Sequence, residues 1–209
     1  MIIGLSGVAG AGKDLFFSLL SEKLNCQKFS LADALKEEVA PFLEDQYGVN
    51  PLTCTREEKD SIRPLLVFHG AFKRNLSEGR HWINKLNKEI KNNLASSVVV
   101  ITDIRYDDFP KDEVYWLKEE LGGLLVHISM YEHIDRGFTS YNHYRKPINE
   151  EERRNDPLIE AQADYTVEWE RAKGDIDRQL DPHIDAFITW LNRKENGLSA
   201  YEKAENTRV

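Results

Sequence analysis

A glycine-rich segment, GVAGAGK at residues 7–13, constrains the fold of this chain more than any other feature. It fits the pattern G-x-x-x-x-G-K, whose backbone N–H groups converge on a phosphate while the lysine supplies a positive charge. The apolar run MIIGLS precedes it, and the segment that follows carries an apolar stripe at helical spacing: Phe16, Leu19, Leu20 and Leu24. The pattern therefore predicts a buried strand, a phosphate-binding loop and an amphipathic helix, in that order.

The loop supplies the first set of candidate binding residues. Glycines remove side chains that would block a polyphosphate, and the N-terminus of the following helix adds its positive dipole end. Lys13 can reach the outer phosphates of a nucleotide. We therefore assign phosphate binding to the residues Gly7, Val8, Ala9, Gly10, Ala11, Gly12, Lys13 and Asp14.

Asp14 stands where this pattern normally has Ser or Thr, whose hydroxyl binds Mg²⁺. A carboxylate is also a hard oxygen ligand, so Asp14 can hold Mg²⁺ directly or through a water molecule. The alternative is that Asp14 only caps the helix, because a negative side chain is favoured at a helix N-terminus. The sequence leaves both roles open, and Asp14 is a candidate metal ligand.

A second cluster, TDIR at residues 102–105, closes the β-branched run SSVVVIT. In open α/β sheets, ligands bind at the carboxyl ends of the strands. Asp103 could orient Mg²⁺ or its water near Lys13, and Arg105 could bind a phosphate in the same crevice. We assign both a catalytic role, with Asp103 as a second metal ligand. A surface salt bridge is the alternative.

Further arginines are candidates for a second substrate and for a lid. In the middle of the chain, we select Arg63 and Arg80 for the phosphate of an acceptor. The polar stretch 131–157 is typical of a lid that closes over phosphates and excludes water, and Arg136 is our candidate for the transferring group. An ordinary charged loop is the alternative, because acidic residues separate the basic ones: Arg136, Arg145, Lys146, Arg153 and Arg154.

Short apolar runs alternate with helical patterns along the chain, which is typical of a parallel sheet covered by helices on both faces. We expect an α/β fold with about five parallel strands, at residues 1–6, 27–32, 96–103, 124–130 and 163–169. Helices are expected at residues 14–24, 32–45, 55–76, 81–94, 113–123 and 176–195. Pro41 should kink or end the second helix, and Pro64 and Gly70 could divide the third.

Length and charge bound the remaining possibilities. The 209 residues suit a single domain at 1–195, followed by a polar tail at 196–209 that should fray. A net charge of −8 disfavours a strong non-specific nucleic-acid binder, although a local basic patch stays open. No segment reaches the ~18 apolar residues of a membrane span, and no signal peptide is indicated. We expect a cytoplasmic protein whose cysteines are reduced. The sequence leaves open whether the protein forms a homodimer.

Six motifs follow one another in an order that resembles a known family. They are GVAGAGKD at 7–14, FSLADALK at 29–36, RPLLVFHG at 63–70, RHW at 80–82, VVITDIR at 99–105 and GGLLVHI at 122–128. Together they resemble the deoxynucleoside monophosphate kinases of bacteriophages and their bacterial relatives, whose loop typically reads GKD. The resemblance covers roughly Met1 to Ile128.

This resemblance implies a P-loop kinase fold and Mg²⁺-dependent transfer of the γ-phosphoryl group of ATP to a deoxynucleoside monophosphate. It implies that ATP is held by Gly7, Gly10, Gly12 and Lys13, with Asp14 near Mg²⁺. The acceptor pocket would be bordered by Asp33 and Lys36, and its phosphate would be bound by some of Arg63, Arg80 and Arg105. A viral origin, and therefore a location in the cytoplasm of a host cell, is implied by the resemblance alone.

Two positions depart from the family pattern. Leu15 and Val67 stand where the family often has Thr and Gln, so the acceptor is not fixed. Two further interpretations stay open. One is a related kinase with another acceptor, such as a hydroxylated base in modified DNA. The other is a nucleotide-binding module without catalytic activity.

Overall fold

The computed structural model describes residues 1–93, 98–137, 139–172 and 178–205. Within these residues, six strands form one sheet: β1 (Ile2–Ser6), β2 (Cys26–Phe29), β3 (Val98–Ile101), β4 (Leu124–Asp135), β5 (Ser140–Tyr144) and β6 (Tyr165–Glu170). The order is β2-β3-β1-β4-β5, and β6 pairs with β4. All pairings are parallel except that of β4 with β5. The predicted α/β fold with five parallel strands is therefore confirmed, and β5 is an additional antiparallel strand.

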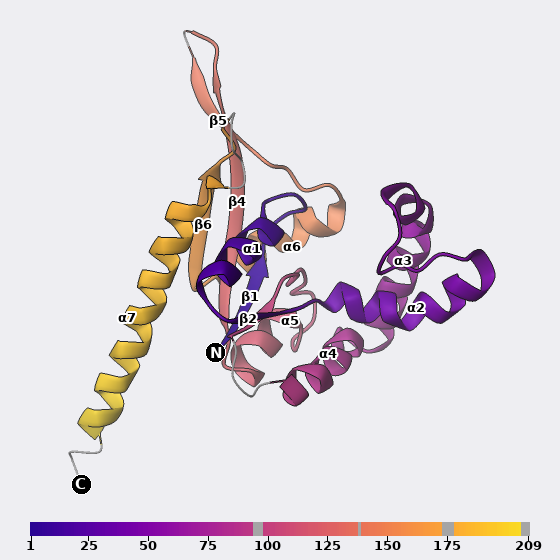
Figure 1. Ribbon diagram of the computed structural model, residues 1–209, viewed down its shortest axis with the longest axis horizontal. Coiled ribbons are helices and arrows are strands. Elements are labelled where there is room, and N and C mark those ends of the chain that lie inside the picture. Colours follow the sequence, from indigo (N-terminus) through magenta and orange to yellow (C-terminus); the bar gives the residue numbers. More distant parts are fainter. Residues whose placement is uncertain (94–97, 138, 173–177, 206–209) are drawn as a thin grey trace.

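Helices cover both faces of the sheet (Figure 1). On one face, α1 (Lys13–Lys23) and α7 (Asp181–Glu205) pack against β1 through a core that includes Ile3, Leu5 and Phe187. On the other face, Ile2, Trp116 and Ile159 belong to a second core. This second face is covered by α4 (Arg80–Asn93), α5 (Glu113–Tyr115), the π-helical turn η1 (Trp116–Glu120) and α6 (Glu150–Glu160). Burial on both faces explains why the central strands read as unbroken apolar runs.

The helices α2 (Leu31–Tyr47) and α3 (Arg56–Leu76) extend to one side of the sheet (Figure 1). Both contain a proline that was expected to interrupt them, and both continue through it. A small core shared by the two helices, with Val39, Leu43 and Ile62, holds them in place. Packing of this kind outweighs the hydrogen bond that each proline removes. Neither Pro41 nor Pro64 therefore ends a helix, and Gly70 also lies inside α3.

The polar stretch 131–157 contains regular secondary structure at both ends. Its first residues extend β4 to Asp135, where the chain turns and returns as β5, so that a hairpin projects from the sheet (Figure 1). Its last residues form the start of α6, whose first turn is capped by Asn149. The sequence pattern did not reveal β5, because every residue of this strand is exposed and no alternation of apolar and polar residues marks it.

Two further elements differ from expectation. The helix predicted at 113–123 is a short α-helical turn followed by the π-helical turn η1. The last helix, α7, continues to Glu205, through residues that were expected to fray. Parts of the elements expected at 81–94, 96–103 and 176–195, and residues 206–209 of the expected tail, lie outside the described residues. Among the described helices, none is both long and apolar enough to cross a membrane.

Candidate active site at the phosphate loop

The glycine loop lies between the end of β1 and the start of α1, as predicted. Gly7, Gly10 and Gly12 have φ values of 123°, 81° and 103°, which L side chains rarely adopt. Gly7 is also confined by its surroundings, since a Cβ there would lie 2.2 Å from the carbonyl oxygen of Ile128. Gly12 precedes the first residue of α1 and turns the chain into the helix. The loop thus presents backbone N–H groups and a helix N-terminus to the same space.

Lys13 is folded over this loop. Its Nζ donates to the carbonyl oxygens of Gly7 at 2.5 Å and Val8 at 3.0 Å. Burial and, secondarily, the nearby Arg105 guanidinium lower the pKa of Lys13. Among the described residues, no carboxylate lies within hydrogen-bond distance of this ammonium, and a phosphate would provide a stronger partner than two carbonyls.

Asp14 is the exposed carboxylate beside this lysine. Its side chain is 85% exposed and forms an ion pair with Lys28, with Nζ 2.7 Å from Oδ1. The hydrogen bond from Lys28 lowers the pKa of Asp14, so the group is a carboxylate over a wide pH range. Mg²⁺ is usually held by one or two carboxylates together with substrate phosphates. Asp14 fits this mode. No group of three or more metal-binding side chains occurs among the described residues.

Asp103 follows the end of β3 and is buried. Its Oδ1 accepts from the N–H of Leu31 at 2.8 Å, and its Oδ2 accepts from the N–H of Ala32 at 2.8 Å and from the hydroxyl of Ser30 at 3.0 Å. Ser30 is itself the N-cap of α2. Asp103 therefore fastens the first turn of α2 to the carboxyl end of β3, and this role occupies both of its oxygens.

A cleft of about 570 Å³ opens beside Lys13, between the start of α1, the residues that follow β3 and the helices α2 and α3. Its lining includes Lys13 and Asp14 together with four of the predicted acceptor residues: Asp33, Lys36, Arg63 and Arg105. Two of these cations form ion pairs: Lys36 Nζ lies 2.5 Å from Asp33 Oδ1, and Arg63 Nη2 lies 2.6 Å from Asp60 Oδ1. Segments far apart in the chain thus bring cations to one cleft.

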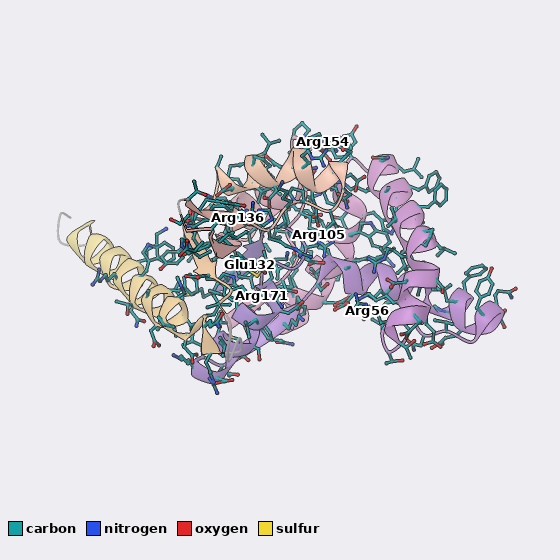
Figure 2. All side chains as sticks on the ribbon, turned by 90° about the horizontal axis from the view of Figure 1, so that it is seen from above. Arg56, Arg105, Glu132, Arg136, Arg154 and Arg171 are labelled. Atoms are coloured by element: carbon teal, nitrogen blue, oxygen red, sulfur yellow. The ribbon has the colours of Figure 1, made fainter. Side chains whose placement is uncertain are left out.

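Arg105 is the least engaged of these cations. It is exposed, and Figure 2 shows it near the middle of the molecule. Its backbone N–H donates to Glu113 at 2.7 Å, whereas its guanidinium forms no ion pair within the described part of the chain. Its effect on the pKa of Lys13 places its charge close to the phosphate loop. A cation at this position can bind an anion without first giving up another partner.

Two predicted residues are not brought to the cleft. Arg80 begins α4 and donates to Glu120 Oε2 at 2.8 Å and to the carbonyl of Lys111 at 3.1 Å, so that it joins α4 to η1. Arg136 lies in the turn of the projecting hairpin, where its N–H donates to the carbonyl of Thr139 at 3.0 Å. Neither residue lines the cleft. Arg80 is held by its ion pair with Glu120, 40 positions away in the sequence. Arg136 is placed by a hairpin that the sequence did not predict.

Other residues reach the site that were not selected from the sequence. Arg145 places its guanidinium against Gly10, and its Nε donates to the carbonyl of Ala9 at 3.4 Å. Arg74 lies at the cleft with its guanidinium carbon 3.9 Å from the ring centroid of Tyr106. Arg145 belongs to the basic residues of the stretch 131–157 noted above, and nothing in the local sequence distinguishes Arg74 or Arg145 from the neighbouring arginines.

A cluster of buried charged groups surrounds Arg74 at the cleft. Arg74 donates to both carboxylate oxygens of the fully buried Asp112, and Glu113 lies beside this pair. Burial raises the pKa of Glu113 to about 8, although Arg74 opposes this effect. Glu113 also accepts from the N–H groups of Arg105 and Tyr106 at 2.7 and 3.1 Å. The cluster therefore shapes the segment that carries Arg105.

No family model and no curated protein matches the chain. Similar solved structures include a dephospho-CoA kinase from Campylobacter jejuni, with 12% identity and a TM-score of 0.47 over 93% of this chain and 98% of that one. A shikimate kinase from Aquifex aeolicus has 16% identity and a TM-score of 0.42 over 93% and 98%. A shikimate kinase from Acinetobacter baumannii, in complex with shikimate, has 15% identity and a TM-score of 0.43 over 90% and 92%. At this level of similarity, the chemistry of the site has to come from its own geometry.

Proposed function

We propose that this chain is a kinase that transfers the γ-phosphoryl group of ATP to a (deoxy)nucleoside monophosphate, giving the diphosphate. The observation that carries this proposal is the common cleft. A phosphate loop with its lysine borders the same space as Lys36 from α2, Arg63 from α3 and Arg105 after β3. A site with cations on two sides suits a reaction in which both reactants are phosphorylated.

The loop is the donor side of this proposal. Its backbone N–H groups, the N-terminus of α1 and Lys13 would bind the β- and γ-phosphates of ATP. Arg145, which already lies against Gly10, is better placed than Arg136 to neutralise charge on the transferring group. Asp14 would hold Mg²⁺, which supplies charge neutralisation at the phosphates when it is bound.

The cleft is the acceptor side. Arg105 would bind the acceptor's phosphate with help from Lys36 and Arg63, whose present partners Asp33 and Asp60 are partly exposed and easily exchanged. The nucleophile is then a phosphate oxygen that is already ionised, so no general base is required. Catalysis would consist of placing the two reactants in line and neutralising their charges.

The test is a panel of acceptors. The protein is incubated with ATP and Mg²⁺ and with each common ribo- and deoxynucleoside monophosphate, and nucleoside diphosphates are separated by anion-exchange chromatography. Formation of a diphosphate from at least one acceptor, in excess of a reaction without protein, is expected. If none of the monophosphates yields a diphosphate while ATP still binds, the acceptor assignment is wrong.

A second candidate is a kinase whose acceptor is a hydroxyl group, such as that of a hydroxylated base in DNA. Glu113 favours it, because this carboxyl lines the cleft and its pKa is raised to about 8. A hydroxyl acceptor needs a general base, and a carboxyl acts as one only when ionised, so transfer would rise with pH up to about 8. A phosphate acceptor, whose second pKa is about 6, is almost fully ionised at pH 7 and would show no further rise between pH 7 and 8. Parallel assays with modified DNA and with monophosphates, each followed from pH 6 to 9, separate the two.

A further inference from the structure

The segment from Arg145 to Glu152 lies directly on the phosphate loop. Its two ends contact opposite backbone groups of one loop residue, Ala9. The N–H of Ala9 donates to Glu152 Oε2 at 3.4 Å, and the carbonyl of Ala9 accepts from Arg145 Nε at 3.4 Å. The same Glu152 oxygen accepts from the N–H of Ile148 at 3.1 Å. The segment is therefore attached to the loop at both ends.

Glu152 occupies a place that suits an anion. Its carboxylate accepts from a loop N–H group, which is the kind of contact that the loop would make to a phosphate oxygen. Its negative charge also partly offsets the lowering of the pKa of Lys13 by burial and Arg105, so the carboxylate and the ammonium attract each other. A phosphate in the loop and an ionised Glu152 at this distance would repel each other.

Arg145 has the opposite relation to a phosphate. It is exposed, its guanidinium lies against Gly10, and it forms no ion pair with the residues that the structure describes. One short segment thus carries a carboxylate that competes with a bound phosphate and a guanidinium that would attract it. The side-chain Oδ1 of Asn149 caps α6 by accepting from the N–H of Glu152 at 2.8 Å, so this cap holds the turn even when the carboxylate leaves the loop.

We propose that Glu152 is a resident anion of the phosphate loop, which the phosphates of the donor nucleotide displace when they bind. In the empty protein, Glu152 and Arg145 hold the segment on the loop. When the donor enters, the carboxylate turns away and Arg145 pairs with the phosphates, so that the segment stays closed over them. This inference rests on the phosphate-binding part of the proposed function, and it does not depend on which acceptor is used.

Glu152→Gln tests the inference, because the amide can still accept from Ala9 while the charge is lost. Glu150→Gln is the matched control. It removes the same charge from the same helical turn, but the Glu150 side chain is 83% exposed and pairs with Arg153. Binding of MgATP, inorganic tripolyphosphate and adenosine is measured by isothermal titration calorimetry for the native protein and both variants. Thermal unfolding confirms that the variants are folded.

Glu152→Gln should bind MgATP and tripolyphosphate roughly three- to tenfold more tightly than the native protein, as expected on removing one nearby like charge. Affinity for adenosine should not change, and Glu150→Gln should match the native protein with all three probes. Unchanged or weaker phosphate binding by Glu152→Gln overturns the inference, and so does an equal gain in Glu150→Gln. Glu152→Ala also lacks the charge, so its affinity for MgATP and tripolyphosphate should rise as well.

The inference and the proposed function can fail separately. Tighter phosphate binding by Glu152→Gln together with no transfer to any monophosphate supports the resident anion and rejects the acceptor. Transfer to a monophosphate without any gain in phosphate affinity supports the kinase and rejects the resident anion. Absence of phosphate binding by every form of the protein rejects both.

Discussion

At the scale of single residues, the site is defined by what each charged group already contacts. Lys13 has two carbonyl partners, Asp14 has one exposed lysine, and Asp103 has three donors that tie it to α2. A group with weak or exposed partners can exchange them for a ligand at little cost, whereas a buried group with several donors cannot do so without losing those contacts. Lys13 and Asp14 therefore fit ligand binding better than Asp103 does.

Replacement of Lys13 tests the loop most directly. Lys13→Ala should lower kcat for diphosphate formation by about 10²–10³-fold, the usual effect of losing one group that stabilises charge in the transition state. Its only hydrogen bonds to described residues are to loop carbonyls, so the free energy of unfolding should change by about 0.5 kcal/mol or less. Steady-state kinetics and urea unfolding measure the two quantities. A variant with native kcat would show that Lys13 does not act on the transferring group.

At the scale of elements, the apolar runs and the glycine loop were read correctly from the sequence because both signals are local. The sequence suggested that α2 could end at Pro41 and that α3 could divide at Pro64, but both helices continue. The packing of Val39 and Leu43 against Ile62 that holds them is a tertiary effect, which a local pattern does not reveal. The hairpin β4–β5 was missed because its second strand is polar and exposed on all residues. Arg136, which the sequence assigned to a lid, lies in the turn of this hairpin.

Glu38 shows how the helices beside the cleft are held together. From α2 it accepts from His69 on α3 and His81 on α4, both at 2.9 Å, and pairs with Lys85. Burial alone would raise the pKa of Glu38, but the hydrogen bonds from Lys85, His81 and His69 outweigh it and hold this pKa well below its ordinary value. Three helices thus meet at one carboxylate, near Trp82 at the wall of the cleft.

Glu38→Gln should therefore lower the free energy of unfolding by about 1–3 kcal/mol at pH 7. Because the folded-state pKa is depressed, the stabilisation by the carboxylate is fully present above the ordinary value of 4.5 and is lost as the pH falls below it. The difference between native and variant should shrink below pH 4.5. Urea unfolding from pH 3 to 7 measures it, with Glu37→Gln, an exposed neighbour on α2, as control. A difference that is independent of pH would contradict this account.

At the scale of the whole molecule, the sequence predicted that residues following two parallel strands gather at one edge of the sheet, because parallel strands end at one edge. The cleft lies beside Lys13 and the residues that follow β3. Which arginines face that edge depends on partners elsewhere in the fold. Arg80 pairs with Glu120 of η1, whereas Arg105 has no such partner in the described residues, and no local pattern separates the two.

This difference between Arg80 and Arg105 gives the last prediction. Arg105→Gln should raise KM for the acceptor monophosphate by roughly 10- to 100-fold, the effect of losing a charge-assisted contact, with a much smaller change in the affinity for MgATP. Arg80→Gln removes an equal charge outside the cleft and should leave both quantities near native. Steady-state kinetics with each substrate varied in turn, together with calorimetric titration of MgATP, measure them. The reverse ranking of the two variants would mean that the acceptor binds outside this cleft, on the side of α4 and η1.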